Sequence, residues 1–144
     1  MAQEKLSIRI PDGVFQAYVA RPSVEGPRPA VVVIQEIFGV NRFVREVADG
    51  LASEGFLAVA PDLFWRIEPG FVASEGDVGM QEGMTIAGQC DRALLLDDAV
   101  AALEHVRALQ VAGFVDVVLD TDAIVGHRCV GVGLCRRQEG EQPA

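Results

Sequence analysis

The alternation of apolar and polar positions near the amino terminus predicts a β-hairpin. Residues 5–10 alternate in this way and residues 14–20 do so again. Between them, residues 11–13 read Pro-Asp-Gly, which are residue types typical of a tight turn. We therefore expect two antiparallel strands, followed by a proline-rich loop at residues 21–29.

The pattern changes after this loop and predicts a βαβ unit. Residues 30–34 form a continuous apolar run rich in valine, which suits a central strand buried on both faces. Residues 56–60 form a second such run, which Pro61 closes. The segment between them is helical in pattern, so the two strands should be parallel and joined by a right-handed crossover.

The helix of this unit is predicted from its cap and its apolar spacing. Asn41 has a residue type that favours the position before a helix. Phe43, Val47 and Leu51 then recur at helical spacing and are expected to face the core, until Gly55 ends the helix.

After residue 61, segments with a clear hydrophobic pattern follow a segment without one. Residues 62–88 show no sustained period and predict a loop-rich excursion with one short helix at most, a feature typical of lids. Residues 91–109 predict a long helix with a charged outer face. The expected core stripe of this helix is Leu96, Val100, Leu103 and Val106. Residues 114–119 and 124–134 are apolar and rich in valine, and the second run predicts a strand.

These elements indicate one α/β domain with a doubly wound sheet, mostly parallel apart from the amino-terminal hairpin. With 144 residues the chain suits a single domain, which we place at residues 1–135. Residues 136–144 are polar and aperiodic and are expected to be a disordered tail. Because a doubly wound sheet needs a helix after its last strand, the predicted sheet is incomplete.

Charge and composition narrow the possible partners. The net charge of −9, with no basic cluster, repels phosphate backbones and argues against nucleic acid. No stretch approaches the roughly 20 apolar residues that span a bilayer, and the start lacks the layout of a secretion signal, so we expect a cytoplasmic protein without a membrane partner. The three cysteines, Cys90, Cys129 and Cys135, fit no metal-binding spacing and are expected to be thiols, most simply small buried residues.

Several charged residues are candidates for function. Glu36 follows the strand at residues 30–34, at the edge where open α/β sheets build their sites, although a solvated loop acid is an equal alternative. Trp65 and Arg66 follow the next strand, and we expect them either to border a substrate pocket or to lie at its rim and pack against the lid. Asp97 and Asp98 on the long helix are expected to be solvated.

Two motifs carry a resemblance to a known family. The string VVVIQEIFGVN at residues 31–41, followed by FLAVAPDLFWR at residues 56–66, resembles the dienelactone hydrolases, or carboxymethylenebutenolidases. The similarity extends from the first hairpin to about residue 109. It implies an α/β-hydrolase in which a cysteine attacks the carbonyl of a small-molecule lactone or ester, with no metal or organic cofactor.

The resemblance also implies roles for individual residues. Glu36 interacts with the nucleophile and helps to make the thiolate, and the backbone N–H of Ile37 contributes to the oxyanion hole. The family's nucleophile lies in a Gly-x-Cys-x-Gly-Gly turn after a strand. Residues 133–135 read Gly-Leu-Cys, so Cys135 is the predicted nucleophile.

The match fails directly after Cys135. Residues 136–138 are Arg, Arg and Gln where the pattern requires one residue and two glycines. Codons for residues 134–138 can be chosen so that a one-base displacement encodes Cys-Val-Gly-Gly. We therefore hypothesise a frame-displaced tail on a truncated product, and coding DNA whose shifted frame cannot encode that sequence would reject this idea.

The first hypothesis about function is a hydrolase of the dienelactone hydrolase type that turns over little. The family's catalytic aspartate and histidine come after the nucleophile and are missing here. His105 and His127 match no family position. Alternatively, the chain is a non-catalytic fragment, either a binding and assembly partner or an unstable product, because the strand at residues 124–134 lacks its covering helix. A third hypothesis is a thiol redox role for Cys129 and Cys135, although their spacing fits no redox motif.

Overall fold

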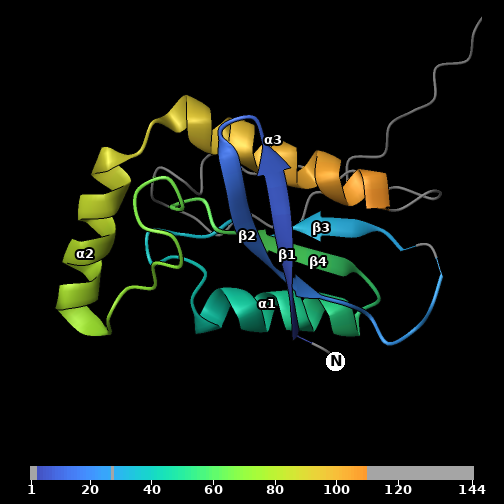
Figure 1. The fold of residues 1–144 in the computed structure, drawn as a ribbon. Coiled ribbons are helices and arrows are strands. Elements are labelled where there is room, and N and C mark those ends of the chain that lie inside the picture. The colour runs from blue at the N-terminus through green and yellow to red at the C-terminus, as the bar shows by residue number, and fades with distance from the viewer. Residues whose placement is uncertain (1–2, 27, 110–144) are drawn as a thin grey trace, which may run out of the picture.

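The sheet has four strands in the part of the chain that the computed structural model describes, residues 3–26 and 28–109. The strands are β1 (Gln3–Ile10), β2 (Gly13–Ala20), β3 (Ala30–Val32) and β4 (Leu57–Pro61), in the spatial order β1-β2-β4-β3. β2 pairs antiparallel with β1 and β4, whereas β3 and β4 are parallel. The predicted hairpin and the predicted parallel pair are both confirmed (Figure 1).

Helix α1 (Arg42–Ser53) connects the two parallel strands, as expected. The side chain of Asn41 caps it, since its Oδ1 accepts a hydrogen bond from the backbone N–H of Val44 at 3.0 Å. The chain leaves the helix at Gly55, whose φ of 96° lies in the region that favours glycine. The sequence signals for both ends of this helix were therefore correct.

The buried face of α1 differs from the predicted one. Phe43 is 61% exposed, whereas its neighbour Val44 is 5% exposed, and Ala48 and Ala52 are also buried. The alanines pack against Ala20 and Ala58 of the sheet. Small side chains on both surfaces let the helix lie close to the strands, so the alanine stripe rather than the larger apolar stripe faces the core.

Helix α2 (Gly76–Gln89) corrects the prediction for residues 62–88. Its 14 residues make it longer than the one short helix that was expected. The buried residues of this helix are Gly79, Gly83 and Ile86. Because two of these three positions are glycines, the helix has little apolar periodicity for a sequence pattern to reveal.

Helix α3 (Arg92–Leu109) confirms the long helix, but its core stripe was predicted wrongly. Asp91 precedes it and accepts a hydrogen bond from the backbone N–H of Ala93 at 2.9 Å. Leu96 and Val100 are exposed, and of the predicted stripe only Val106 is fully buried. The buried positions are Leu95, Asp98, Ala99, Ala102 and Val106.

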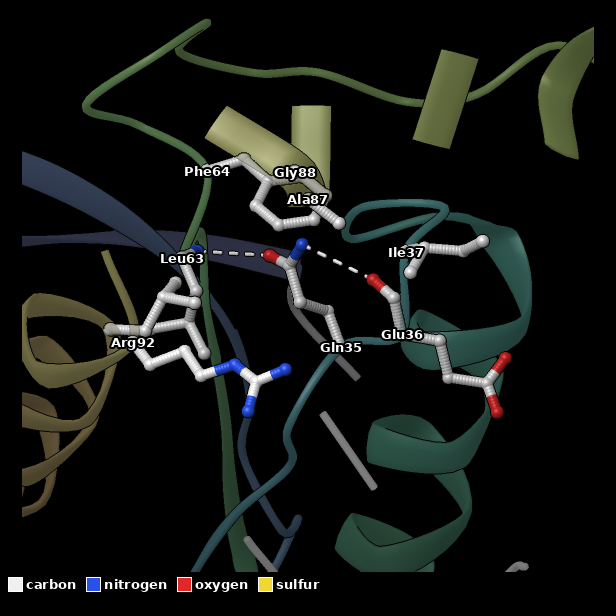
Figure 2. Close-up of a pocket in the computed structure, with 9 residues that line it drawn as sticks. Gln35, Glu36, Ile37, Leu63, Phe64, Ala87, Gly88 and Arg92 are labelled. Carbon is white, nitrogen blue, oxygen red and sulfur yellow. Dashed lines mark hydrogen bonds between the residues drawn. The ribbon is translucent and has the colours of Figure 1, made fainter. Parts of the chain in front are cut away.

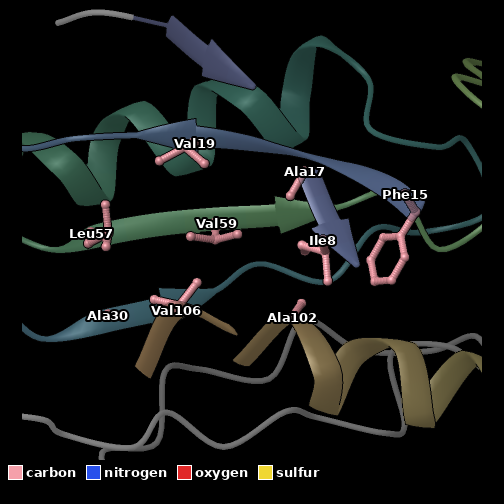
Figure 3. Close-up of a cluster of buried hydrophobic side chains, with 9 residues drawn as sticks. All are labelled: Ile8, Phe15, Ala17, Val19, Ala30, Leu57, Val59, Ala102 and Val106. Atoms are coloured by element: carbon pink, nitrogen blue, oxygen red, sulfur yellow. The ribbon is translucent and has the colours of Figure 1, made fainter. Parts of the chain in front are cut away.

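The core lies on both faces of the sheet. On one face, Ala102 and Val106 of α3 pack over apolar residues of all four strands (Figure 3). These strand residues are Ile8, Phe15, Ala17, Val19, Ala30, Leu57 and Val59. α1 covers the opposite face, so the sheet lies between two helices, as Figure 1 shows. This layering is the α/β class predicted from the sequence.

A buried carboxylate joins α3 to the segment after β4. Asp98 is 1% exposed, and it accepts hydrogen bonds from Nε and Nη2 of Arg66, both at 2.9 Å, and from Nε1 of Trp65 at 2.8 Å. Arg66 also donates to Asp12 in the hairpin turn at 2.9 Å, and these contacts raise its pKa. The expectation of a solvated Asp98 was wrong, because the acid has partners that compensate for its burial. Asp97 is exposed, as expected.

The remaining predictions concern parts of the chain outside the described residues. These are the runs at residues 114–119 and 124–134, the tail at residues 136–144, His127, Cys129 and Cys135. Within the described residues, no helix combines the length and apolar character needed to cross a lipid bilayer.

We predict that Asp98→Ala destabilises the fold by about 2–4 kcal/mol, because it leaves the Trp65 N–H and the Nε and Nη2 donors of the mostly buried Arg66 guanidinium without their acceptor. The adjacent variant Asp97→Ala should change the free energy of unfolding by no more than about 0.5 kcal/mol. Urea denaturation of both variants measures the difference. Equal effects would show that the buried ion pair contributes nothing to stability.

Candidate active site

The loop that follows β3 is fixed to the end of β4 by one buried side chain. Gln35 is buried, and its Oε1 accepts a hydrogen bond from the backbone N–H of Leu63 at 2.9 Å. Its Nε2 donates to the backbone carbonyl of Glu36 at 3.3 Å (Figure 2). The two parallel strands therefore present their carboxyl ends in a fixed relation, with Glu36 at the junction.

A pocket of about 250 Å³ opens at this junction. The ends of the two strands supply Gln35, Glu36, Ile37, Leu63 and Phe64, helix α2 supplies Ala87 and Gly88, and helix α3 supplies Arg92 and Leu95 (Figure 2). The predicted site residues Glu36 and Ile37 thus line one pocket.

Two charged residues line this pocket, and their side chains do not pair with each other. The Glu36 carboxylate and the Arg92 guanidinium lie on either side of Gln35 (Figure 2). No salt bridge joins them, and neither side chain has a hydrogen-bond partner among the described residues. An acid and a cation in a largely apolar pocket are both available to act on a ligand.

Helix α2 packs with its backbone directly against the loop that contains Ile37. A Cβ atom on Gly83 would collide with the Ile37 carbonyl oxygen. In the same loop, Gly39 has a φ of 79°, and a Cβ there would collide with the carbonyl oxygen of Phe71. These two glycines let neighbouring segments approach the loop closely, and the close contacts fix where the Ile37 peptide lies.

A buried carboxylate, Asp62, holds the segment after β4 in a turn by accepting hydrogen bonds from its backbone. Asp62 accepts hydrogen bonds from the backbone N–H groups of Phe64 at 3.1 Å and Gly70 at 2.7 Å. Burial raises the pKa of this carboxyl above its ordinary value of 3.8, and the two hydrogen bonds oppose that shift. Asp62 holds the turn that bears Leu63 and Phe64, the walls of the Glu36 pocket.

Other candidate side chains lie away from this pocket. Trp65 and Arg66 belong to the cluster around Asp98, and His105 on α3 does not line the pocket. The Cys90 thiol donates to the carbonyl oxygen of Ile86 at 3.3 Å, and burial raises its pKa, which disfavours the reactive thiolate. Among residues 3–26 and 28–109, no three metal-binding side chains are grouped to hold an ion.

Sequence reasoning named two of the residues that line this pocket and did not name others. It identified Glu36 and Ile37, which lie together, whereas the predicted nucleophile Cys135 falls outside the described residues. It missed Gln35 and Arg92. Gln35 stands inside the QEIFG string, so the motif itself was the available signal, but nothing in the sequence connects Arg92 with that string.

The sequence of this chain matches a known protein family over most of its length. The sequence model of the dienelactone hydrolase family matches residues 15–119. The chain belongs to the dienelactone hydrolase family. The match includes the Glu36 loop, the segment after β4, and helices α2 and α3, so every residue that lines the pocket lies inside the family region.

Individual family members agree with this assignment. Carboxymethylenebutenolidase 1 of Cupriavidus pinatubonensis is 33% identical over 127 residues, which cover 85% of this chain and 49% of that protein. The carboxymethylenebutenolidase of Pseudomonas putida is 42% identical over 83 residues, which cover 57% of this chain and 35% of that protein. The chain thus spans about half the length of these relatives or less.

A solved structure shows the same fold. A crystal structure of a dienelactone hydrolase candidate from Klebsiella pneumoniae is 32% identical, with a TM-score of 0.57, and the similarity covers 75% of this chain and 42% of the other. The described sheet and helices therefore share the fold of part of that chain.

We predict that Gly83→Ala lowers stability by about 1–3 kcal/mol relative to Gly50→Ala, because the added methyl group must displace the Ile37 peptide. Gly50 is a matched control, since it lies in helix α1 and a Cβ there meets nothing within 4 Å. Gly50→Ala should itself stabilise the fold by roughly 0.5–1 kcal/mol. Thermal and urea unfolding of both variants test this, and equal stabilisation by both would contradict the close packing of α2.

Proposed function

We propose that this chain provides the amino-terminal half of the active site of a hydrolase that cleaves a lactone or carboxylic ester through a thiolate at Cys135. One observation carries the proposal: Glu36 and Ile37 lie together on a pocket at the carboxyl end of β3. The names of the relatives support a cyclic ester, since carboxymethylenebutenolidases are named for a butenolide. The reaction proposed here requires no metal or organic cofactor.

In the proposed reaction, the Glu36 carboxylate accepts the hydrogen of the Cys135 thiol and raises the fraction of thiolate. The sulfur attacks the ester carbonyl carbon, and the carbonyl π electrons move to the oxygen. The backbone N–H of Ile37 donates a hydrogen bond to this oxyanion. When the carbonyl re-forms, the ester C–O bond breaks, and the departing oxygen takes up the proton that Glu36 had accepted from the thiol. Water then hydrolyses the thioester, which yields the acid and regenerates the thiol.

The last step requires a base that activates water. None of the described residues that line the pocket is a histidine, and His105 lies elsewhere on α3. The resemblance implies that the family's aspartate and histidine follow the nucleophile along the chain. We therefore propose that this polypeptide by itself turns over little.

A non-catalytic role is the second candidate. β3 is the last strand in the described sheet, so one of its backbone edges has no strand partner among the described residues. An open edge is a surface on which a further strand can pair. Size-exclusion chromatography distinguishes the two cases, because a discrete monomer counts against an assembly role.

We predict that Glu36 activates Cys135 in the chain as it stands. In a Cys90→Ser, Cys129→Ser background, the single remaining thiol should be alkylated by iodoacetamide roughly tenfold more slowly after Glu36→Gln, which corresponds to about one pKa unit. The control Glu54→Gln changes an exposed acid at the end of α1 and should have no effect. Identical alkylation rates for the Glu36 and Glu54 variants would remove Glu36 from the proposed site.

We also predict that a dienelactone is hydrolysed only at background rate by this chain, whereas a chimera completed with the carboxyl-terminal half of the Cupriavidus relative is active. In the chimera, Glu36→Gln should lower kcat by about 10²-fold or more, because it removes proton transfer from the nucleophile. Substantial turnover by the isolated chain would contradict the need for the missing base. A fully active Glu36→Gln chimera would instead contradict the role of Glu36.

A further inference from the structure

A second pocket of about 330 Å³ lies on the α1 side of the sheet. It is bordered by the hairpin, by the first turn of α1 and by the segment after β4, and it shares no residue with the Glu36 pocket. Its apolar lining includes Val14, Val40, Ala60, Phe71 and Val72. Val14 and Val72 remain exposed, so the pocket presents an apolar surface open to solvent.

Two cations stand at the rim of this pocket, Lys5 and Arg45. Lys5 is the register partner of Tyr18 in the hairpin, so both side chains extend from the same face of the sheet. The Arg45 guanidinium lies over the Tyr18 ring, 5.7 Å from its centroid. Neither cation forms an ion pair among the described residues. Their N–H donors are therefore available to an anion.

The acids around the pocket, in contrast, already have partners. Glu4 accepts a hydrogen bond from Arg21 at 2.6 Å, and Asp49 accepts one from the Tyr18 hydroxyl at 2.6 Å. Asp62 accepts from two backbone N–H groups. Burial and the hydrogen bond to Asp49 raise the pKa of Tyr18 to about 12, so the phenol stays neutral at physiological pH. Among the charged side chains that line the pocket, Lys5 and Arg45 are therefore the ones without a hydrogen-bond or ion-pair partner among the described residues.

We propose that this second pocket binds a small organic anion, whose apolar body rests on Val14, Val40 and Val72 and whose carboxylate is held by Arg45 and Lys5. The volume lies within the range of pockets that hold small ligands. The planar guanidinium, positioned by the Tyr18 ring, offers two parallel donors that match a carboxylate. This site is independent of the proposed hydrolase reaction, because none of its residues takes part in that chemistry.

The single tryptophan of the chain reports on this site, because Trp65 lines the second pocket and not the Glu36 pocket. The probe is cyclohexanecarboxylate, which does not absorb at the excitation wavelength, with cyclohexanemethanol as its neutral analogue. We expect a saturable change in fluorescence with the carboxylate, at least about tenfold weaker binding of the alcohol, and an affinity that falls as salt rises. No saturable change, or equal affinity for both compounds, would overturn the proposal.

Variants then assign the binding to one pocket. Arg45→Gln should weaken carboxylate binding about tenfold, and Arg45→Lys should restore part of it by keeping the charge. Arg42→Gln, an exposed position on the same helix, and Arg92→Gln, at the Glu36 pocket, should bind as the unmodified chain does. Loss of binding in Arg92→Gln with retention in Arg45→Gln would place the anion in the Glu36 pocket and overturn the proposal. Circular dichroism establishes that each variant is folded.

Discussion

Gln35 lies just after β3, and its side-chain amide oxygen accepts a hydrogen bond from the backbone N–H of Leu63, just after the parallel strand β4. Two segments that are 28 residues apart are thereby held together by a buried hydrogen bond. Loss of the amide would leave a buried donor without a partner, which costs free energy in addition to the bond itself. The position of Glu36, the peptide of Ile37 and the pocket wall at Leu63 all depend on this connection.

Small residues explain why the strands were easier to predict than the faces of the helices. A strand alternates its side chains with a period of two, so the hairpin was evident from hydrophobicity alone. In the helices, larger apolar residues such as Phe43 and Leu96 lie in solvent, while Ala48 and Ala102 are buried. Hydrophobicity ranks the larger side chain as the better core residue, but close approach of helix and sheet selects the smaller one. The glycines of α2 extend the same principle to a helix with hardly any apolar stripe.

Some residues of the candidate site and its surroundings could be predicted from the sequence, and others could not. Glu36 and Ile37 were predictable because they belong to a local motif whose position at a strand end follows from the βαβ pattern. Arg92 and Asp98 were not, because their surroundings come from segments far away in the chain, such as Trp65 and Arg66. Pairing over such distances leaves no trace in a single sequence. Cys135 remains a prediction from the motif, and the match of the family to residues 15–119 stops before it.

The cluster around Asp98 also has a consequence for the order in which the protein can assemble during its synthesis. Arg66 meets Asp12, 54 residues earlier in the chain, and Asp98, 32 residues later. During synthesis, Arg66 therefore follows its hairpin acceptor Asp12 and precedes its main acceptor Asp98. Until α3 emerges from the ribosome, the Trp65 N–H has no acceptor from that helix. The core layer under α3 closes later still, because Ala102 and Val106 follow Asp98 in the chain.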